Sequence, residues 1–205
     1  PRGAIEECLS EAGASSERIE ILDAPDAIEM DASPVEAVRT KRDSSIVKMA
    51  LLGSRRAEAP VDAVLSAGNT GACVSAATMF MRRLPGCHRP GIAVTLPSLH
   101  GPVVLCDAGA NPEPRPLHLA QYGVMAAVYA SEILGVKEPR VAQVNISSEE
   151  AKGTDFVKQV RDLLRQTPGL NYIGYIEGRD LLEGTADVVV TDGFVGNTML
   201  KLAEG

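Results

Sequence analysis

Two segments of the chain combine glycine, asparagine and threonine in a pattern suited to anion binding. Residues 63–72 read AVLSAGNTGA and residues 188–198 read VVVTDGFVGNT, so each begins as an apolar run and ends in a polar turn. Glycines let backbone N–H groups approach a ligand closely, and a helix that follows directs its positive end at the same place. The candidate binding residues in these turns are Gly68, Asn69, Thr70, Gly71, Gly193 and Asn197, with Asp192 opening the second turn.

A simpler interpretation of both turns is helix capping. Asn69 and Thr70 are common capping residues, and Asp192 can act as a cap or bend the second turn. Neither turn contains the Gly-Lys-Ser/Thr of a P-loop or the spaced glycines of a dinucleotide site, so ATP and NAD are poorly supported. The occurrence of two such turns after two apolar runs favours anion binding over capping alone.

Polar side chains follow two further apolar runs. Asp107 and Asn111 lie in the turn CDAGANP at 106–112, and Lys152 precedes Gly153 in the segment NISSEEAKGTD at 145–155. The alternative for Lys152 is an ordinary solvated lysine. Because ligands of open α/β sheets bind beyond the carboxyl ends of the strands, we expect these residues and the two glycine turns to form one crevice.

Composition limits the classes of function. The chain has 205 residues, of which 45% are hydrophobic and 23% charged, which is enough for a sizeable core. Its net charge of −7 and 3% aromatic content argue against nucleic-acid binding. Four cysteines without a CxxC pair and three histidines without ligand spacing predict no metal site. With no signal peptide and no apolar run near the ~18 residues of a membrane helix, we expect a cytoplasmic protein.

Runs rich in valine and isoleucine alternate with helical periodicity, which is typical of βαβ units in an α/β fold. We therefore predict an open, mostly parallel sheet flanked by helices, and an antiparallel pair joined by the turn at 96–102. The predicted strands cover residues 18–22, 63–66, 92–96, 103–107, 141–145, 172–176 and 187–191.

Two helices differ in their predicted surroundings. Residues 156–165 carry one apolar stripe, as a surface helix on a sheet requires. Residues 117–134 have no polar face in the middle, so we expect that helix to be buried all round, either in the core or in a homodimer interface. The chain opens in a helical pattern without Met and ends without a polar tail. We expect residues 1–205 to be a single continuous domain, truncated at both ends.

Six segments of the chain are similar to segments of one known family. The segments EMDASPVEAVRTKRDSS, LSAGNTGA, TLPS, DAGANPEPRPLHLAQYGVMAAVYA, NISSEEAKGTD and EGRDLLEGTADVVVTDGFVGNTMLKLAEG resemble, in this order, the PlsX family of bacterial phosphate acyltransferases. The resemblance covers nearly the whole chain. The family's N-terminal Asp-Ala-Met-Gly-Gly-Asp turn and its C-terminal portion are absent, and the family's DVGAN reads DAGAN here.

The resemblance implies an activity and a set of partners. The family transfers a fatty acyl group from acyl carrier protein to inorganic phosphate, and a membrane glycerol-3-phosphate acyltransferase uses the resulting acyl phosphate for phospholipid synthesis. It implies a Rossmann-like fold similar to isocitrate and isopropylmalate dehydrogenases, a homodimer, no organic cofactor, and a cytoplasmic enzyme that is peripheral at the inner face of the membrane.

The candidate residues suit this chemistry. Lys152 would neutralise the phosphate or the tetrahedral charge, and Asp192 would orient phosphate or accept its proton, so we assign catalysis to these two. The backbone around Gly68–Gly71 and Gly193, with the amides of Asn69 and Asn197, would supply fixed donors.

The charge of the chain bears on its partners. Acyl carrier protein is acidic, so docking on a chain of charge −7 requires a local basic patch. Its candidates are Arg39, Lys41, Arg42, Arg55, Arg56, Arg82 and Arg83. Two rival functions stay open: a phosphotransacetylase-like enzyme acting on short acyl-CoA, and a non-catalytic domain that binds a phosphorylated metabolite.

Overall fold

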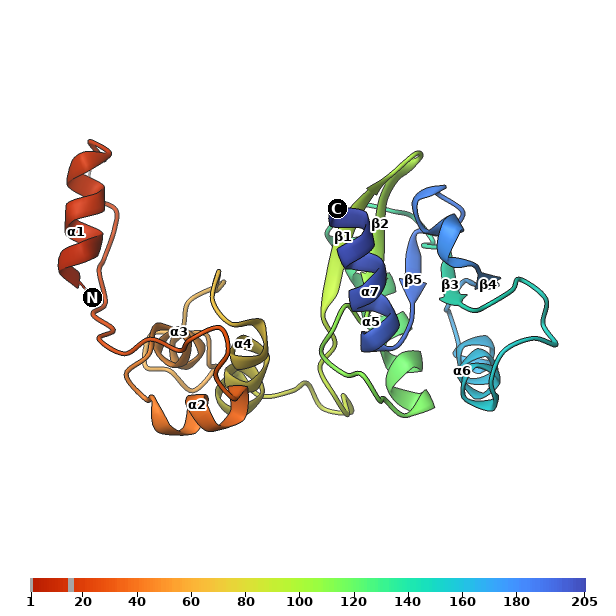
Figure 1. Ribbon diagram of the computed structural model, residues 1–205, viewed down its shortest axis with the longest axis horizontal. Coiled ribbons are helices and arrows are strands. Elements are labelled where there is room, and N and C mark those ends of the chain that lie inside the picture. Colours follow the sequence, from red (N-terminus) through yellow and green to blue (C-terminus); the bar gives the residue numbers. More distant parts are fainter. Residues whose placement is uncertain (1, 15–16) are drawn as a thin grey trace. The chain divides into compact units, whose positions relative to one another are not determined.

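The computed structural model describes residues 2–14 and 17–205. They form two compact units, residues 1–85 and residues 86–205, which are described separately (Figure 1). No helix in the described part of the chain is long and apolar enough to cross a membrane.

The first unit is helical. Its elements are α1 (Arg2–Glu11), α2 (Pro34–Thr40), α3 (Ser45–Leu52), α4 (Thr70–Ala76) and a π-helical turn, η1 (Ala77–Met81). Helix α3 begins after Ser44, whose Oγ accepts a hydrogen bond from the Val47 N–H. Serine is a favoured residue at such an N-cap position. A small core joins α2, α3 and α4 through Val38, Ile46, Val47, Ala50, Ala72 and Ala76.

Two predicted strands are wrong. Residues 18–22 and 63–66 are extended or irregular and pair with no strand in the part of the chain that the structure describes. A strand needs a neighbour for its backbone N–H and C=O groups. Without one, Leu65 has 96% of its surface exposed in the middle of the second segment.

The second unit is built on a five-stranded sheet. Its strands are β1 (Ala93–Ser98), β2 (Gly101–Cys106), β3 (Val141–Val144), β4 (Tyr172–Ile176) and β5 (Val188–Val190), in the order β1-β2-β5-β3-β4. The hairpin β1–β2 is antiparallel and the other three pairings are parallel. The predicted open, mostly parallel α/β sheet is therefore confirmed, and so is the antiparallel turn.

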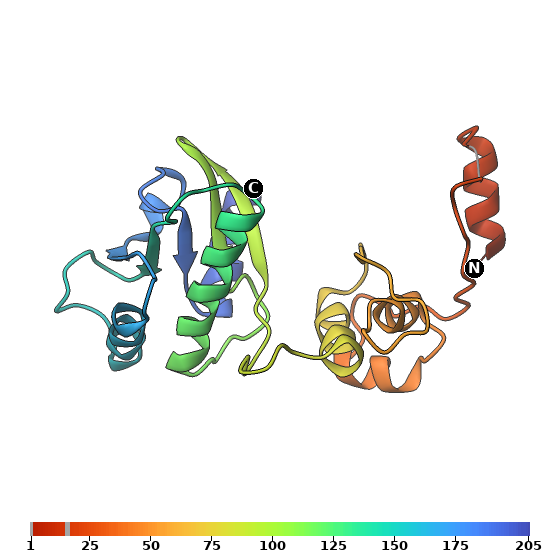
Figure 2. The ribbon, with the colours of Figure 1, turned by 180° about the vertical axis from the view of Figure 1, so that it is seen from behind.

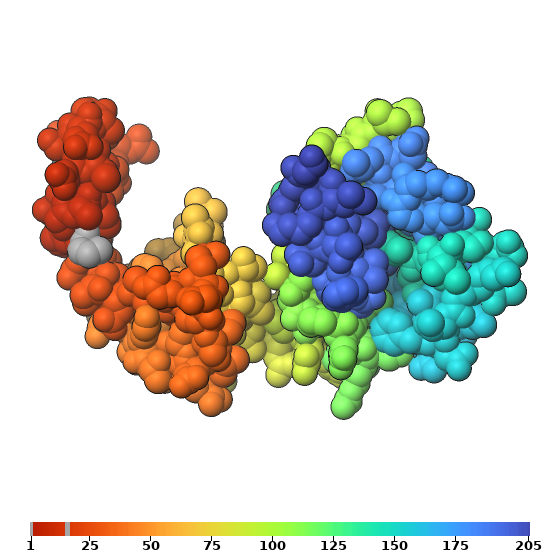
Figure 3. Space-filling view, viewed as in Figure 1, coloured from red at the N-terminus to blue at the C-terminus, as the bar shows by residue number. Residues whose placement is uncertain are grey.

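Helices cover both faces of this sheet. One face carries α5 (Pro116–Glu132) and α6 (Asp155–Gln166), which pack on β2, β3 and β5 (Figure 2). The other face carries α7 (Gly193–Glu204) and a 3₁₀ turn, η2 (Gly178–Leu182). Figure 3 shows α7 at the surface of this second face. Both layers are formed because the central strands are apolar on both sides, as in other parallel sheets.

Within this chain helix α5 is buried on one side only, and the alternative of a homodimer interface stays a prediction. Tyr122, Ala126 and Ala130 face the sheet and are inaccessible or nearly so. Leu117, Val124 and Val128, spaced at seven and four residues, lie on the opposite side and are exposed, Val128 by 56%. The face of α5 on the sheet thus belongs to the core, and the opposite face is an exposed apolar surface within this chain.

An ion pair joins the amino ends of two neighbouring strands. Arg140 donates from Nε and Nη2 to the two carboxylate oxygens of Asp187, at 3.0 and 2.9 Å, and its backbone N–H adds a bond of 2.8 Å. The side-chain hydrogen bond from Arg140 is the main cause that holds the pKa of Asp187 below its ordinary value. The contact fixes the register of β3 against β5 where both strands begin.

We expect the substitution Asp187→Asn to lower the free energy of unfolding by about 1 kcal/mol at neutral pH, since the pair is partly exposed. Because the folded-state pKa is lowered, the stabilisation is complete above the ordinary aspartate pKa of about 3.9 and is lost as the pH falls through the lower folded value. Urea unfolding between neutral and acid pH would measure it. The control is Asp162→Asn, whose carboxylate also pairs with an arginine, Arg161, at 2.7 Å, but is 52% exposed against 20% for Asp187. Identical pH profiles for Asp187→Asn and the parent chain would contradict the prediction.

Candidate functional site

The carboxyl ends of the parallel strands bring three predicted segments to one edge of the sheet. Because β2, β5 and β3 are neighbours and parallel, the loops that follow them, at 107–111, 191–197 and 145–154, leave the sheet at the same edge. The first two loops are in direct contact: Asp107 N–H donates to Thr191 O at 3.0 Å, and Gly193 N–H donates to Asn111 O at 2.8 Å.

Asp107 organises the loop after β2. Its carboxylate is fully buried and accepts hydrogen bonds from the backbone N–H groups of Ile92, Gly109, Ala110 and Asn111, and from the Asn111 side chain, at 2.8–3.2 Å. Burial, followed by the charge of Asp107, raises the pKa of the preceding Cys106 thiol to about 12. Cys106 is therefore a protonated core thiol, and the Asp107 oxygens are engaged within the protein.

Asn111 is likewise engaged, and it reveals an arginine that the sequence analysis missed. Its amide nitrogen donates to Pro90 O at 2.7 Å and to Asp107, while its oxygen accepts a bond of 3.3 Å from Arg89. Arg89 is exposed and brings a positive charge to this loop. Only its position shortly before a predicted strand could have drawn attention to it.

His118, also missed, lies near this arginine in the first turn of α5. Its Nδ1 accepts a hydrogen bond of 3.1 Å from the Arg115 backbone N–H. Burial first, and then the charge of Arg89, lower the pKa of His118 below its usual value. The imidazole is consequently neutral at neutral pH. The positive charge beside it comes from the two arginines, Arg89 and Arg115.

The turn after β5 makes a tight junction with the Asp107 loop. Asp192 caps α7, with Oδ1 accepting bonds from the N–H groups of Phe194 and Val195 at 3.0 and 2.9 Å. A Cβ on Gly193 would lie 2.8 Å from backbone atoms of Asn111, and one on Gly196 would overlap the carbonyl oxygen of Asp107. Asn197 lies beside Gly109. These glycines bring the N-terminus of α7 against the loop.

The Lys152 loop is held from both sides. The Asn145 amide donates to Ser147 O at 2.9 Å and to Lys152 O at 3.3 Å, and a Cβ at Gly153 would approach its oxygen to 2.5 Å. From α6, Arg161 donates to Glu150 O at 3.2 Å and Arg165 to the Glu150 carboxylate at 2.6 Å. Lys152 itself is exposed. Gly153, at φ +97°, is the residue that permits this fold of the backbone.

The turn with Gly68, Thr70 and Gly71 belongs to the first unit, where Asn69 caps α4. Asn69 Oδ1 accepts a bond of 3.0 Å from the Ala72 N–H, and its amide nitrogen donates to the carbonyls of Glu29 and Met30 at 3.1 and 3.0 Å. The side chain is buried. The capping interpretation thus describes what the Asn69 side chain does within this unit.

Some candidate side chains are hydrogen-bonded within the protein, and others are open to a ligand. The side chains of Asn69, Asp107 and Asn111 are occupied by bonds within the protein. Within residues 2–14 and 17–205, no partner is found for the Lys152 ammonium, the second oxygen of Asp192 or the Asn197 amide. The open groups come from two loops of one sheet edge and comprise a cation, a carboxylate oxygen and an amide.

The sequence of the whole chain is similar to those of known proteins. Residues 1–205 match the family model described as "Fatty acid synthesis protein". The chain belongs to this family. It is 48% identical over 192 residues to a phosphate acyltransferase of Bacillus pumilus and 46% identical over 192 residues to that of Bacillus subtilis, with 93% of the chain covered in each case. The chain spans 57% of the length of each of these two relatives.

Solved structures show the same fold. The EutD phosphotransacetylase from Staphylococcus aureus superposes with a TM-score of 0.65 at 20% identity, and a phosphotransacetylase from Streptococcus pyogenes with 0.69 at 17%. Both matches cover the whole chain, and 72% and 71% of the other proteins. The family resemblance and the α/β fold expected from the sequence are confirmed.

Proposed function

We propose that this chain is the phosphate-binding part of an enzyme that transfers a fatty acyl group from acyl carrier protein to inorganic phosphate. The proposal rests on the sheet edge where an ammonium, a carboxylate oxygen and an amide, each without a partner among the described residues, accompany the positive end of α7. The names of relatives at 46–48% identity agree with it. A phosphate oxygen would attack the thioester carbonyl and the carbon–sulfur bond would break. The departing thiolate would take up the proton that the phosphate gives up.

Each candidate residue has a defined part in this proposal. Lys152 would hold the phosphate or the tetrahedral oxyanion, and the free oxygen of Asp192 would orient the nucleophile, so both would be catalytic. Asn197 would bind substrate, whereas Asp107 and Asn111 would shape the loop. The N–H group of Gly193 is already bonded to Asn111 O, so Gly193 would act through the close approach of α7 to this loop. The assignment of Gly68, Asn69, Thr70 and Gly71 to substrate binding stays a prediction from the sequence, because this turn belongs to the other unit. No organic cofactor and no metal are required.

The proposed partners follow from the same reaction. Acyl carrier protein would dock on the basic residues of the first unit, and a membrane glycerol-3-phosphate acyltransferase would receive the acyl phosphate. The exposed stripe of Leu117, Val124 and Val128 supports a homodimer, because an apolar helix face is usually covered. We place the enzyme in the cytoplasm and at the inner face of the membrane.

The experiment measures phosphate-dependent release of free thiol from long-chain acyl carrier protein by the protein at its natural length. We expect Lys152→Ala and Asp192→Asn each to lower kcat/KM by about tenfold or more, because each removes charge stabilisation near the reacting atoms. The matched control is Lys137→Ala, an exposed lysine that precedes β3 at the opposite edge of the sheet.

Three results would contradict the proposal. Unchanged turnover in both variants would show that Lys152 and Asp192 do not have the proposed catalytic roles. Faster turnover of acetyl-CoA than of long-chain acyl carrier protein would favour a phosphotransacetylase-like enzyme. Phosphate binding without any thiol release would favour a non-catalytic domain.

A further inference from the structure

The first unit contains a pocket that holds none of the residues proposed to be catalytic, although two of the proposed docking arginines, Arg56 and Arg82, line it. Its volume is about 620 Å³, within the range of ~300–1,000 Å³ typical of small-molecule sites. Apolar side chains form most of its wall, namely Leu22, Leu51, Leu52, Ala57, Met79 and Phe80. All the lining residues belong to residues 1–85, so the pocket is a property of that unit alone.

The apolar wall is left open to solvent. Leu22, Leu51 and Leu52 are exposed by 54%, 46% and 38%, although leucines adjoining a core are normally covered. A contiguous patch of this kind is more often a binding surface than scattered exposed leucines are. Its chemistry favours an aliphatic group.

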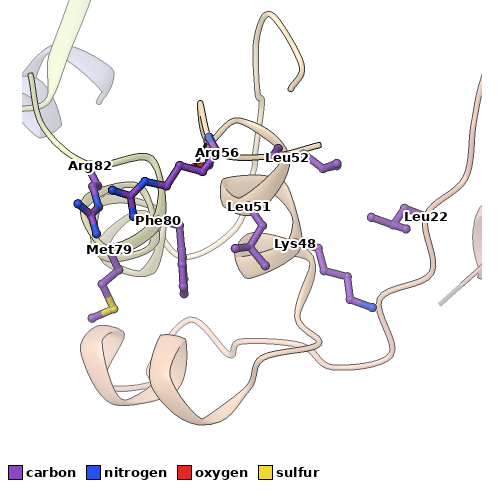
Figure 4. A pocket seen from close by; sticks show the side chains of 10 residues that line it. Leu22, Lys48, Leu51, Leu52, Arg56, Met79, Phe80 and Arg82 are labelled. Carbon is purple, nitrogen blue, oxygen red and sulfur yellow. Dashed lines mark hydrogen bonds between the residues drawn. The ribbon is translucent and has the colours of Figure 1, made fainter. Parts of the chain in front are cut away.

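Two arginines line the same pocket without an ion pair. Figure 4 shows Arg56 and Arg82 at the end formed by Met79 and Phe80. Within the described ranges 2–14 and 17–205, neither guanidinium has a carboxylate partner. Lys48, at the other end, differs: its ammonium lies 3.1 Å from Asp43 and donates to Asp23 O at 2.7 Å. The net charge at the Met79–Phe80 end is therefore positive and uncompensated.

The backbone at Arg82 is held in an unusual conformation. Its φ of 70° and ψ of 173° are favourable for glycine and costly for arginine, and they follow directly from the π-helical turn η1. Phe80, within η1, lies under a third arginine, Arg42, whose guanidinium carbon is 5.3 Å from the ring centroid. Positive charge thus surrounds the apolar Phe80 wall.

From this combination we infer a binding site for a single-chain anionic amphiphile, an alkyl phosphate or a fatty carboxylate. The aliphatic chain lies along the leucines, Met79 and Phe80, and the anionic head pairs with Arg56 and Arg82. Guanidinium groups recognise phosphate and carboxylate through paired hydrogen bonds, and a desolvated apolar wall binds the methylene chain. The inference does not depend on the proposed acyl transfer, because it predicts binding and not turnover.

The test is titration calorimetry of the chain with n-dodecyl phosphate, laurate and dodecanol, each below its aggregation concentration. We expect either anion to bind about tenfold or more tightly than dodecanol, and n-dodecyl phosphate about tenfold or more tightly than n-butyl phosphate. The relative affinity of phosphate and carboxylate identifies which head group the pocket prefers. Equal binding of dodecanol and the anions, or no binding of any of them, would overturn the inference.

Variants locate the site. Arg56→Gln and Arg82→Gly should each weaken dodecyl phosphate binding by about fivefold or more, because each removes one charge-assisted contact. Arg82→Gly also relieves the positive φ, so its resistance to urea should equal or exceed that of the parent, and a loss of affinity cannot then be a loss of fold. The control is Arg55→Ala, a neighbouring exposed arginine outside the pocket. Equal affinity loss in the control, or none in Arg56→Gln and Arg82→Gly, would refute the site.

Discussion

Gly196→Ala is expected to cost about 3 kcal/mol or more of the free energy of unfolding, among the largest effects of any single methyl group in the chain. The added Cβ would overlap the carbonyl oxygen of Asp107 and lie 3.1 Å from a methyl group of Thr191. Both obstacles are close, and the first is backbone, so no side-chain rotation can remove the clash. Helix α7 must then move away from the loop after β2.

Chemical denaturation of the chain measures this effect, and amide hydrogen exchange locates it. Exchange should accelerate first at Gly193, whose N–H donates to Asn111 O at 2.8 Å. The matched control is Gly178→Ala, where an added Cβ meets nothing within 4 Å. A midpoint for Gly196→Ala equal to that of this control would show that α7 does not need close contact with the Asp107 carbonyl.

The sequence predicts the second unit well because its strands satisfy one another's backbone hydrogen-bonding groups. Five predicted strands, at 92–96, 103–107, 141–145, 172–176 and 187–191, correspond to β1, β2, β3, β4 and β5 with shifts of at most two residues. Valine-rich runs between helical segments signal burial on both faces, and the described sheet provides it. The same pattern at 63–66 gives no strand. Hydrophobic periodicity indicates the tendency of a segment to form a strand, but it does not show whether a pairing partner is present.

The candidate site is predicted less completely, for a related reason. Local sequence shows that Asn69 can cap a helix, but it cannot show that the amide also bonds to Glu29 and Met30, about forty positions earlier. Those bonds occupy Asn69 and leave Asn197 as the open amide. Arg89 likewise reaches Asn111 across 22 positions. Residue type identifies candidates, whereas long-range contacts decide which groups stay available to a ligand.

The arginines of the first unit illustrate the same limit. Arg55, Arg56, Arg82 and Arg83 follow α3 and η1, as expected for cations near helix ends. Their sequence neighbours do not separate Arg56 and Arg82 from the other two. Only the folded chain brings this pair to one pocket beside Phe80.

Asp107→Ala is expected to destabilise the second unit by about 3 kcal/mol or more, because it removes a buried acceptor shared by five N–H donors. Four of these belong to the backbone of Ile92, Gly109, Ala110 and Asn111, and they cannot turn elsewhere without breaking the loop. Asp107→Asn should be nearly as harmful, since an amide group would present N–H donors to N–H donors.

Denaturation of both variants, with Asp162→Ala as a control, separates a buried carboxylate from a half-exposed one that pairs with Arg161 at the surface. Fast amide exchange at Gly109, Ala110 and Asn111 would identify the loop as the first region to open. A loss below about 1 kcal/mol in Asp107→Ala would contradict the role assigned to these bonds. Because Asn111 O also accepts from Gly193, the Asp107 carboxylate fixes indirectly the N-terminus of α7, where the proposed phosphate site lies.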